Sequence, residues 1–150
     1  MVSIPAVLDS TCLIGLDNIG HLDLAEALLS PAFLPPEVTR EVGIVIPWTT
    51  VVAPSDKALV ASLQLMVDAG EAEAIALALE KRVRVILDDR KARSVASRLG
   101  VPVTGTVGLL LKAKQTGLVT AIKPLLAALN SNQFHISREL IAEALRLAGE

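Results

Sequence analysis

Aromatic side chains are almost absent from this 150-residue chain, which has only Phe33, Trp48 and Phe134. Because 52% of the residues are nonetheless hydrophobic, the core must be built from Leu, Ile, Val and Ala. That composition suits small helices packed on a buried sheet. The scarcity of aromatic rings also argues against a protein that binds single-stranded nucleic acid by stacking bases on them.

Cysteine is nearly missing as well. Cys12 is the only one, which excludes a disulfide within the chain and is typical of a reducing, cytoplasmic compartment. No apolar run approaches the ~18 residues that span a bilayer, and the stretch 1–5 lacks the basic start of a secretory signal. We therefore expect a cytoplasmic protein with no membrane segment, folded as a single domain over residues 1–150.

Short apolar runs alternate with helical patterns along the whole chain. The runs predict strands at 4–9, 32–34, 83–87 and 101–103, and 47–54 has some strand character. The helical patterns predict helices at 10–20, 22–29, 36–43, 56–67, 70–81, 89–99, 106–116, 119–129 and 137–148. This order indicates an α/β fold with a mostly parallel sheet of about four to five strands wrapped by helices.

Carboxylates stand where several of these elements begin or end. Asp9 closes the first strand, Asp88 and Asp89 close the strand 83–87, and Glu41 and Glu71 lie on the helices 36–43 and 70–81. The carboxyl ends of parallel strands meet at the edge of a sheet where ligand sites form. Acids gathered there without basic partners suit a hard divalent cation. The pattern therefore indicates metal-dependent phosphodiester chemistry.

Asp9 and Glu41 also have structural interpretations. Asp9 could cap the next helix, although Ser10 and Thr11 already offer caps. A carboxylate that ends an apolar strand must otherwise be solvated, paired or bound to metal. Glu41 could be a surface residue beside Arg40, and its candidacy depends on the other acids.

Glu71 competes with Glu73 for one role, because two residues apart on a helix lie about 200° around its axis. Glu71 heads an apolar stripe through Ile75, whereas Glu73 heads a mixed stripe through Leu77 that we expect nearer to solvent. Glu71 is therefore the better ligand, and its structural alternative is a capping box with Asp68.

Asp88 and Asp89 should point to opposite sides, because side chains alternate along a strand. One of them can cap the following helix while the other faces the site. We therefore expect only one to be a direct ligand and the other to bind through water.

Basic residues are concentrated near the Asp88–Asp89 pair, since seven of the 14 fall between positions 81 and 98. A basic zone beside an acidic pocket suits a phosphate backbone. Arg84, Arg90, Lys91 and Arg93 are the candidate nucleic-acid contacts, with a solvated helix face as the alternative interpretation.

Four motifs in this order resemble the PIN-domain nucleases, in the branch of VapC-type toxins, and the segment after Gly105 resembles an uncharacterised subgroup of PIN-like proteins. The motifs are 7–10 (Val-Leu-Asp-Ser), 34–42 (a proline-led helix ending in its acid), 71–78 (an acid leading an Ala-rich helix) and 85–89 (a strand ending in Asp). The chain departs from the family pattern in two places. The third motif has Glu where Asp is commoner, and the acid Asp88 precedes the last Asp of the fourth motif, where a basic residue is often found.

The resemblance implies a three-layer α/β/α fold and a Mg²⁺- or Mn²⁺-dependent ribonuclease. It implies Asp9, Glu41, Glu71 and Asp89 as catalytic metal ligands, with Asp88 auxiliary. It also implies cytoplasmic RNA as substrate and a small antitoxin as inhibitor, in a toxin–antitoxin pair. The apolar C-terminal helices could supply a homodimer or antitoxin surface through Leu125, Leu126, Leu129, Leu140, Ile141, Leu145 and Leu147. The alternative is a catalytically silent PIN-like scaffold that binds a partner protein or nucleic acid.

Overall fold

One five-stranded parallel sheet organises the chain. The computed structural model describes residues 3–150; the first two residues, part of the stretch inspected for a secretory signal, lie outside it. The strands are β1 (Ile4–Leu8), β2 (Leu29–Leu34), β3 (Thr49–Val51), β4 (Arg84–Ile86) and β5 (Val103–Thr104), in the spatial order β3-β2-β1-β4-β5. Every neighbouring pair is parallel, which confirms the predicted α/β class.

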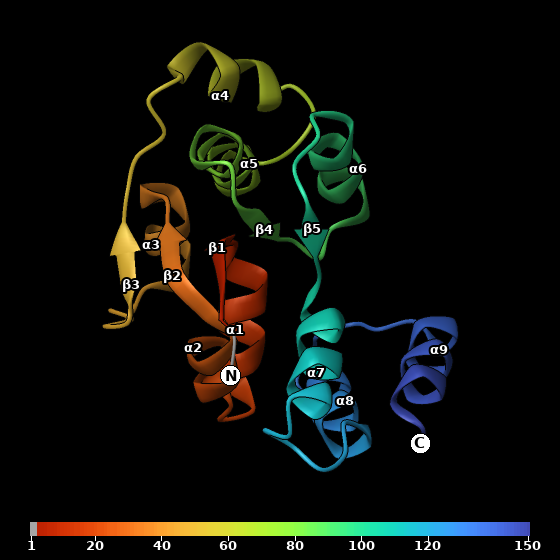
Figure 1. The fold of residues 1–150 in the computed structure, drawn as a ribbon. Coiled ribbons are helices and arrows are strands. Elements are labelled where there is room, and N and C mark those ends of the chain that lie inside the picture. The colour runs from red at the N-terminus through yellow and green to blue at the C-terminus, as the bar shows by residue number, and fades with distance from the viewer. Residues whose placement is uncertain (1–2) are drawn as a thin grey trace.

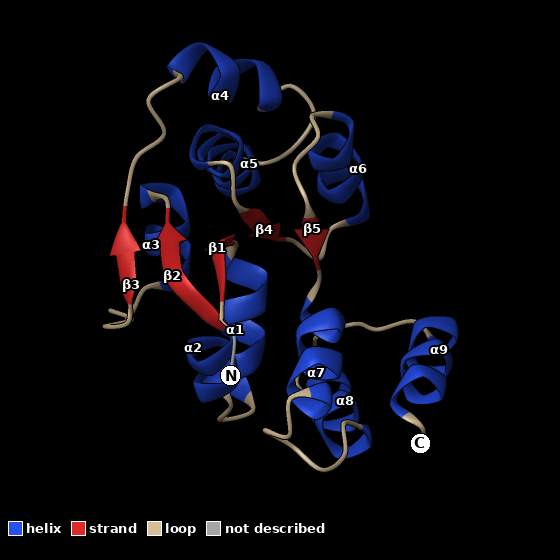
Figure 2. Ribbon diagram, viewed as in Figure 1, coloured by secondary structure: helices blue, strands red, loops and turns tan. Residues whose placement is uncertain are grey.

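Helices cover both faces of this sheet (Figure 1). They are α1 (Ser10–Asn18), α2 (Leu22–Leu28), α3 (Pro36–Val42), α4 (Lys57–Leu63), α5 (Ala69–Lys81), α6 (Arg90–Arg98), α7 (Thr106–Gln115), α8 (Lys123–Ser131) and α9 (Arg138–Ala148). Figure 2 shows α4, α5 and α6 on one side of the strands and α1, α2, α7 and α8 on the other. The result is three layers.

Two apolar cores fill the space between the layers, as alternation along a strand requires. Val7 belongs to the core under α5 and α6, whereas its neighbours Ala6 and Leu8 belong to the core under α1, α2 and α7. Both cores consist mainly of Leu, Ile, Val and Ala, and Cys12 lies fully buried in one of them as filler.

Several boundaries differ from those expected. The helix placed at 119–129 is α8 and begins at Lys123, because Pro124 lacks the N–H that a helix interior needs and fits only a first turn. Helix α4 ends at Leu63, well before position 67. Strand β2 starts at Leu29, and the segment 47–54 contains β3, which pairs with β2 at the sheet edge.

Two expectations about exposure are wrong. Leu77 is fully buried, because α5 lies between α4, α6 and the sheet and is buried nearly all round. Leu125, Leu126 and Leu129 of α8 lie in the core and offer no docking surface. No helix within residues 3–150 is long and apolar enough to cross a membrane.

Candidate active site

The candidate site lies where the strand order reverses. The chain builds the sheet outward from β1 through β2 to β3, then returns beside β1 to add β4 and β5. A crevice forms at the carboxyl ends of the strands at such a switch point. Asp9 follows β1 and Asp88 follows β4, and the backbone N–H of Asp9 donates to the carbonyl of Ile86 at 3.1 Å. The two acidic motifs are thereby brought to one edge.

Buried polar residues of the described chain gather at this same edge. They are Asp9 and Ser10 after β1, Glu71 in the first turn of α5, and Thr106 at the start of α7. Polar groups are rarely buried without partners. Their gathering at the switch point is the main structural indication of a functional site.

Asp9 is the central acid. Its side chain is 4% exposed and stands at the N-cap position of α1, but makes no capping hydrogen bond. Ser10 and Thr11, which the sequence offered as caps, lie inside α1, because the helix already begins at Ser10. Burial raises the pKa of Asp9 from 3.8 to about 7; the Ser10 N–H opposes this rise, and the charges of Glu71, Asp68 and Glu41 add to it. A buried carboxyl in this state favours a proton or a cation.

Glu71 is 8% exposed, and its charge acts on Asp9. It also forms the capping box offered as its alternative role: its Oε1 accepts from the Asp68 N–H at 3.1 Å, and Asp68 Oδ1 accepts from the Glu71 N–H at 2.8 Å. Burial raises the pKa of Glu71 to about 7; the Asp68 N–H opposes the rise, and the charges of Asp68 and Asp89 reinforce it. Glu71 therefore has a structural role and still contributes its charge to the group of Asp9, Glu41, Asp68 and Glu71, which we call the acid cluster.

Asp68 is the member of the cluster that sequence reasoning assigned only to helix capping. Its charge acts on Asp9, Glu41 and Glu71, so it belongs to the same group of acids. The spacing of Asp68 from Glu71 in the sequence predicts the capping box but does not predict that Asp68 lies near Asp9 and Glu41.

Glu41 reaches the cluster from α3 because α5 begins with a glycine at its second position. A Cβ built on Gly70 would collide with Glu41 Oε1, so the absent side chain leaves the room that Glu41 occupies. Burial raises the pKa of Glu41, with the charges of Asp68 and Glu37 adding and the Ser10 hydroxyl opposing. Glu41 and Asp68 are exposed, whereas Glu71 is buried.

Glu73 is more exposed than Glu71, as expected, but it is half-buried and has a partner within the protein. Its Oε1 accepts from the backbone N–H of Glu37 at 3.1 Å and so holds the first turn of α3. This contact fixes α3 against α5 and thereby helps to place Glu41.

Asp88 and Asp89 have separate partners, as alternation predicted. Asp88 accepts from the Thr106 N–H at 2.8 Å and from the Thr106 hydroxyl at 2.7 Å. Burial raises the pKa of Asp88, while Thr106 and Arg93 lower it. Asp89 is exposed and caps α6, accepting from the Ala92 N–H at 2.9 Å through Oδ2. Its charge reaches Glu71, so Asp89 adjoins the cluster while Asp88 is directed to α7.

The cluster has no basic partner. Within residues 3–150, none of the ion pairs involves these acids. No three Asp, Glu, His or Cys side chains of that part of the chain already enclose a metal position. The donor set still fits a hard divalent cation, because it consists of carboxylate oxygens whose charge nothing offsets. Glu71 and Asp89 each use one oxygen for capping and retain a second.

The four candidate nucleic-acid contacts divide into two kinds. Arg84 is structural: its Nη1 donates to Thr104 Oγ1 at 2.9 Å and to the Val103 carbonyl at 3.3 Å, joining β4 to β5. Arg93 is half-buried and donates to the Leu87 carbonyl at 2.8 Å. Arg90 and Lys91 are exposed in the first turn of α6.

The raised pKa of Asp9 predicts how the metal-free protein responds to pH. A carboxyl with a raised folded-state pKa binds its proton more tightly when folded, so its stabilisation is complete below about pH 4 and is lost as the pH rises through about 7. We expect the wild type to lose on the order of 3 kcal/mol of unfolding free energy relative to Asp9→Asn over that interval. Urea unfolding in EDTA from pH 4 to pH 8 measures this difference. A difference independent of pH would show that Asp9 ionises normally.

Comparison with known proteins identifies the family. A family model described as a PIN domain matches residues 5–150, which is nearly the whole chain and includes every acid of the cluster. No curated protein matches the chain.

Proposed function

Since the chain belongs to the PIN-domain family, whose members are in general nucleases, we propose that it is a Mg²⁺- or Mn²⁺-dependent endoribonuclease. The observation that carries the proposal is the Asp9 carboxylate, which is buried at the switch point, feels the charges of Glu41, Asp68 and Glu71, and forms no ion pair with a basic side chain of residues 3–150. Asp9 and Glu71 would hold the ion, with Glu41 and Asp89 completing the set of oxygen donors. A bound ion of this kind lowers the pKa of a coordinated water and offsets charge on the phosphodiester.

The protein's own residues supply the rest of the chemistry. Asp9 and Glu71 are buried, and a counter-charge interacts with a carboxylate more strongly there than in bulk water. Glu41 is exposed at the mouth of the cluster and would orient the attacking water there. Arg90 and Lys91, on the neighbouring first turn of α6, would position the RNA backbone without reading its sequence.

The test of this proposal is cleavage of single-stranded RNA by the purified protein in Mn²⁺ and in EDTA. We expect products in Mn²⁺ alone. Equal product in both conditions would contradict the metal dependence, and no product in either would contradict the nuclease.

Glu71→Gln should reduce cleavage far more than Glu73→Gln. Glutamine keeps an Oε1 acceptor, so the capping contact of Glu71 and the Glu37 contact of Glu73 both survive while the charge is removed. Of these two residues, only Glu71 acts on Asp9 through its charge. We expect roughly a 10²-fold loss of kcat for Glu71→Gln and a small effect for Glu73→Gln. A loss in Glu73→Gln as large as that in Glu71→Gln would reverse the assignment.

We also propose a cytoplasmic toxin of a toxin–antitoxin pair that acts as a homodimer and is inhibited by a small antitoxin. Two pairs of exposed apolar residues outside the site support a protein-binding surface: Ile44 with Val45 after α3, and Leu65 with Met66 after α4. Contiguous exposed apolar surface is typical of protein–protein interaction sites. Sedimentation of the protein alone, and of Val45→Glu, tests the dimer; a monomeric wild type would contradict it.

A second candidate function, a catalytically silent scaffold, is favoured by one observation. Glu71, Asp88 and Asp89 all have structural partners: a capping box, Thr106 and the first turn of α6. A silent scaffold needs those contacts and no cation. Mn²⁺ affinity therefore discriminates the two candidates.

A further inference from the structure

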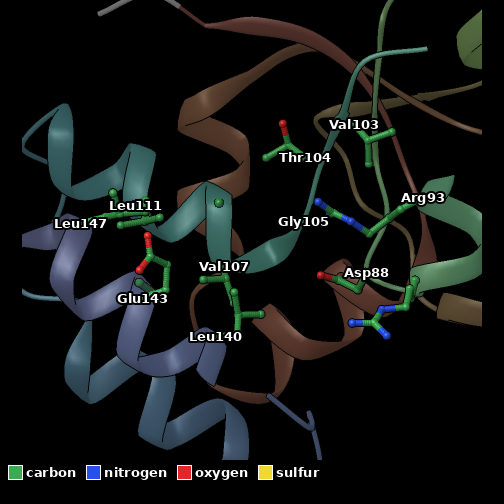
Figure 3. A pocket seen from close by; sticks show the side chains of 13 residues that line it. Asp88, Arg93, Val103, Thr104, Gly105, Val107, Leu111, Leu140, Glu143 and Leu147 are labelled. Atoms are coloured by element: carbon green, nitrogen blue, oxygen red, sulfur yellow. The ribbon is translucent and has the colours of Figure 1, made fainter. Parts of the chain in front are cut away.

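A pocket of about 540 Å³ opens between α6 and α9, next to Asp88 (Figure 3). We name it the α6–α9 pocket. One end is formed by Asp88, Arg90 and Arg93, and the opposite wall by Val107, Leu140 and Leu147. Asp88 follows β4, whose Ile86 carbonyl accepts from the Asp9 N–H at 3.1 Å, so the first end of the pocket lies at the same strand edge as Asp9.

This end carries two guanidinium groups and one carboxylate, that of Asp88, whose two oxygens accept from Thr106. Arg90 and Arg93 form none of the ion pairs found within residues 3–150. Arg93 is held in place by its bond to the Leu87 carbonyl, and it fits because Gly105 has no side chain: a Cβ there would lie 2.7 Å from Arg93 Nη1. A guanidinium has five N–H donors in a fixed plane, so one internal bond leaves donors for a phosphate.

The opposite wall of the pocket is aliphatic and exposed to solvent. Leu140 is 46% exposed and Leu147 is 56% exposed, two turns apart on the same side of α9. The carboxylate of Glu143 lies on this wall too. That carboxylate is ion-paired with Arg146, so the guanidinium groups that line the pocket are at the other end. A ligand with one phosphate would therefore enter with the phosphate at the arginine end and its uncharged part at the α9 end.

We propose that the α6–α9 pocket is a nucleotide subsite, which takes one unstacked nucleotide of single-stranded RNA next to the cleaved phosphodiester. Its phosphate binds Arg90 and Arg93, and its base lies against Val107, Leu140 and Leu147. This inference rests on the proposed function. The pocket volume is in the range of small-ligand sites, and unstacked bases are what proteins read in single-stranded RNA. Because no aromatic residue lines the pocket, the base is held by burial and not by stacking.

The subsite is tested by binding in EDTA, where no cleavage is needed. The probe is a fluorescein-labelled pool of unstructured eight-nucleotide RNAs, and Kd is measured for the wild type and for Leu140→Trp, which fills the pocket from an exposed position. Leu79→Trp is the matched control, a leucine of α5 that is 37% exposed and outside the pocket. We expect Leu140→Trp to occupy the volume that the base would fill and so to weaken binding about tenfold, and Leu79→Trp to bind as the wild type does.

A second variant addresses the phosphate end. Arg90→Gln changes an exposed residue and should weaken binding and lower the slope of log Kd against log salt by about 1. Wild-type affinity in both Leu140→Trp and Arg90→Gln overturns the subsite, even if the protein cleaves RNA. Unchanged RNA affinity with a loss of self-association in Leu140→Trp assigns the pocket to a second protein copy and also overturns it. Weakened RNA binding by an inactive protein supports the subsite and contradicts only the nuclease.

Discussion

Asp9→Asn should abolish metal-dependent cleavage of single-stranded RNA and leave the fold intact. The Asp9 carboxylate is buried at the end of β1, where Glu41, Asp68 and Glu71 all act on its pKa. Asparagine has the same shape without the charge, so an ion held by this group loses its central donor. Loss of one such interaction lowers kcat on the order of 10³-fold. The measurement is the rate of product formation in Mn²⁺.

The matched control is Asp17→Asn, the same substitution at an exposed position of α1. It should cleave at the wild-type rate. Wild-type activity in Asp9→Asn would show that Asp9 does not bind the catalytic ion. Unfolding of Asp9→Asn would contradict the account as well, because relief of repulsion predicts an unchanged or higher metal-free melting temperature.

Mn²⁺ should raise the melting temperature of the wild type by several degrees. Folding gathers four acids in one cluster, a cost the unfolded chain does not bear, and a cation that binds only the folded state offsets it. At a hundredfold excess over Kd, such binding stabilises by roughly 2.7 kcal/mol. For a domain of this size that is a shift on the order of 5–10 °C.

Two comparisons make the thermal shift specific. Asp9→Asn should show a smaller shift with Mn²⁺ than Asp17→Asn, which retains the cluster. A wild-type melting curve unmoved by millimolar Mn²⁺ would favour the silent scaffold, and equal shifts in the two variants would place the ion elsewhere.

Helices and strands were predictable from sequence where the apolar pattern was unambiguous. The apolar runs ending in Asp9 and Asp88 are β1 and β4, and the position of the parallel strand ends brought the acidic motifs to one edge. Helix α8 begins at Lys123 and not at position 119 as the apolar pattern predicts, because Pro124 fits only the first turn of a helix. Strand β3 is three residues long at the sheet edge, and its pairing with β2 depends on contacts that local sequence does not encode.

The candidate site was less predictable than the fold. The sequence identified Glu71 over Glu73 correctly as the more buried acid, because helical periodicity fixes which residues share a face. It did not identify Asp68 as a member of the cluster, or the contact that Gly70 makes possible for Glu41. Both arise where α3 meets the start of α5, a tertiary contact between segments about thirty residues apart.

The most direct test of the central claim is a titration of the protein with Mn²⁺, in which free Mn²⁺ is counted by its EPR signal. The account predicts that the wild type and Asp17→Asn bind Mn²⁺ with the same Kd and that Asp9→Asn binds it at least roughly tenfold more weakly, as expected when a ligand or its support is lost. Identical binding curves for the wild type and Asp9→Asn, or no binding by the wild type, would contradict the claim that these acids form a divalent-metal site.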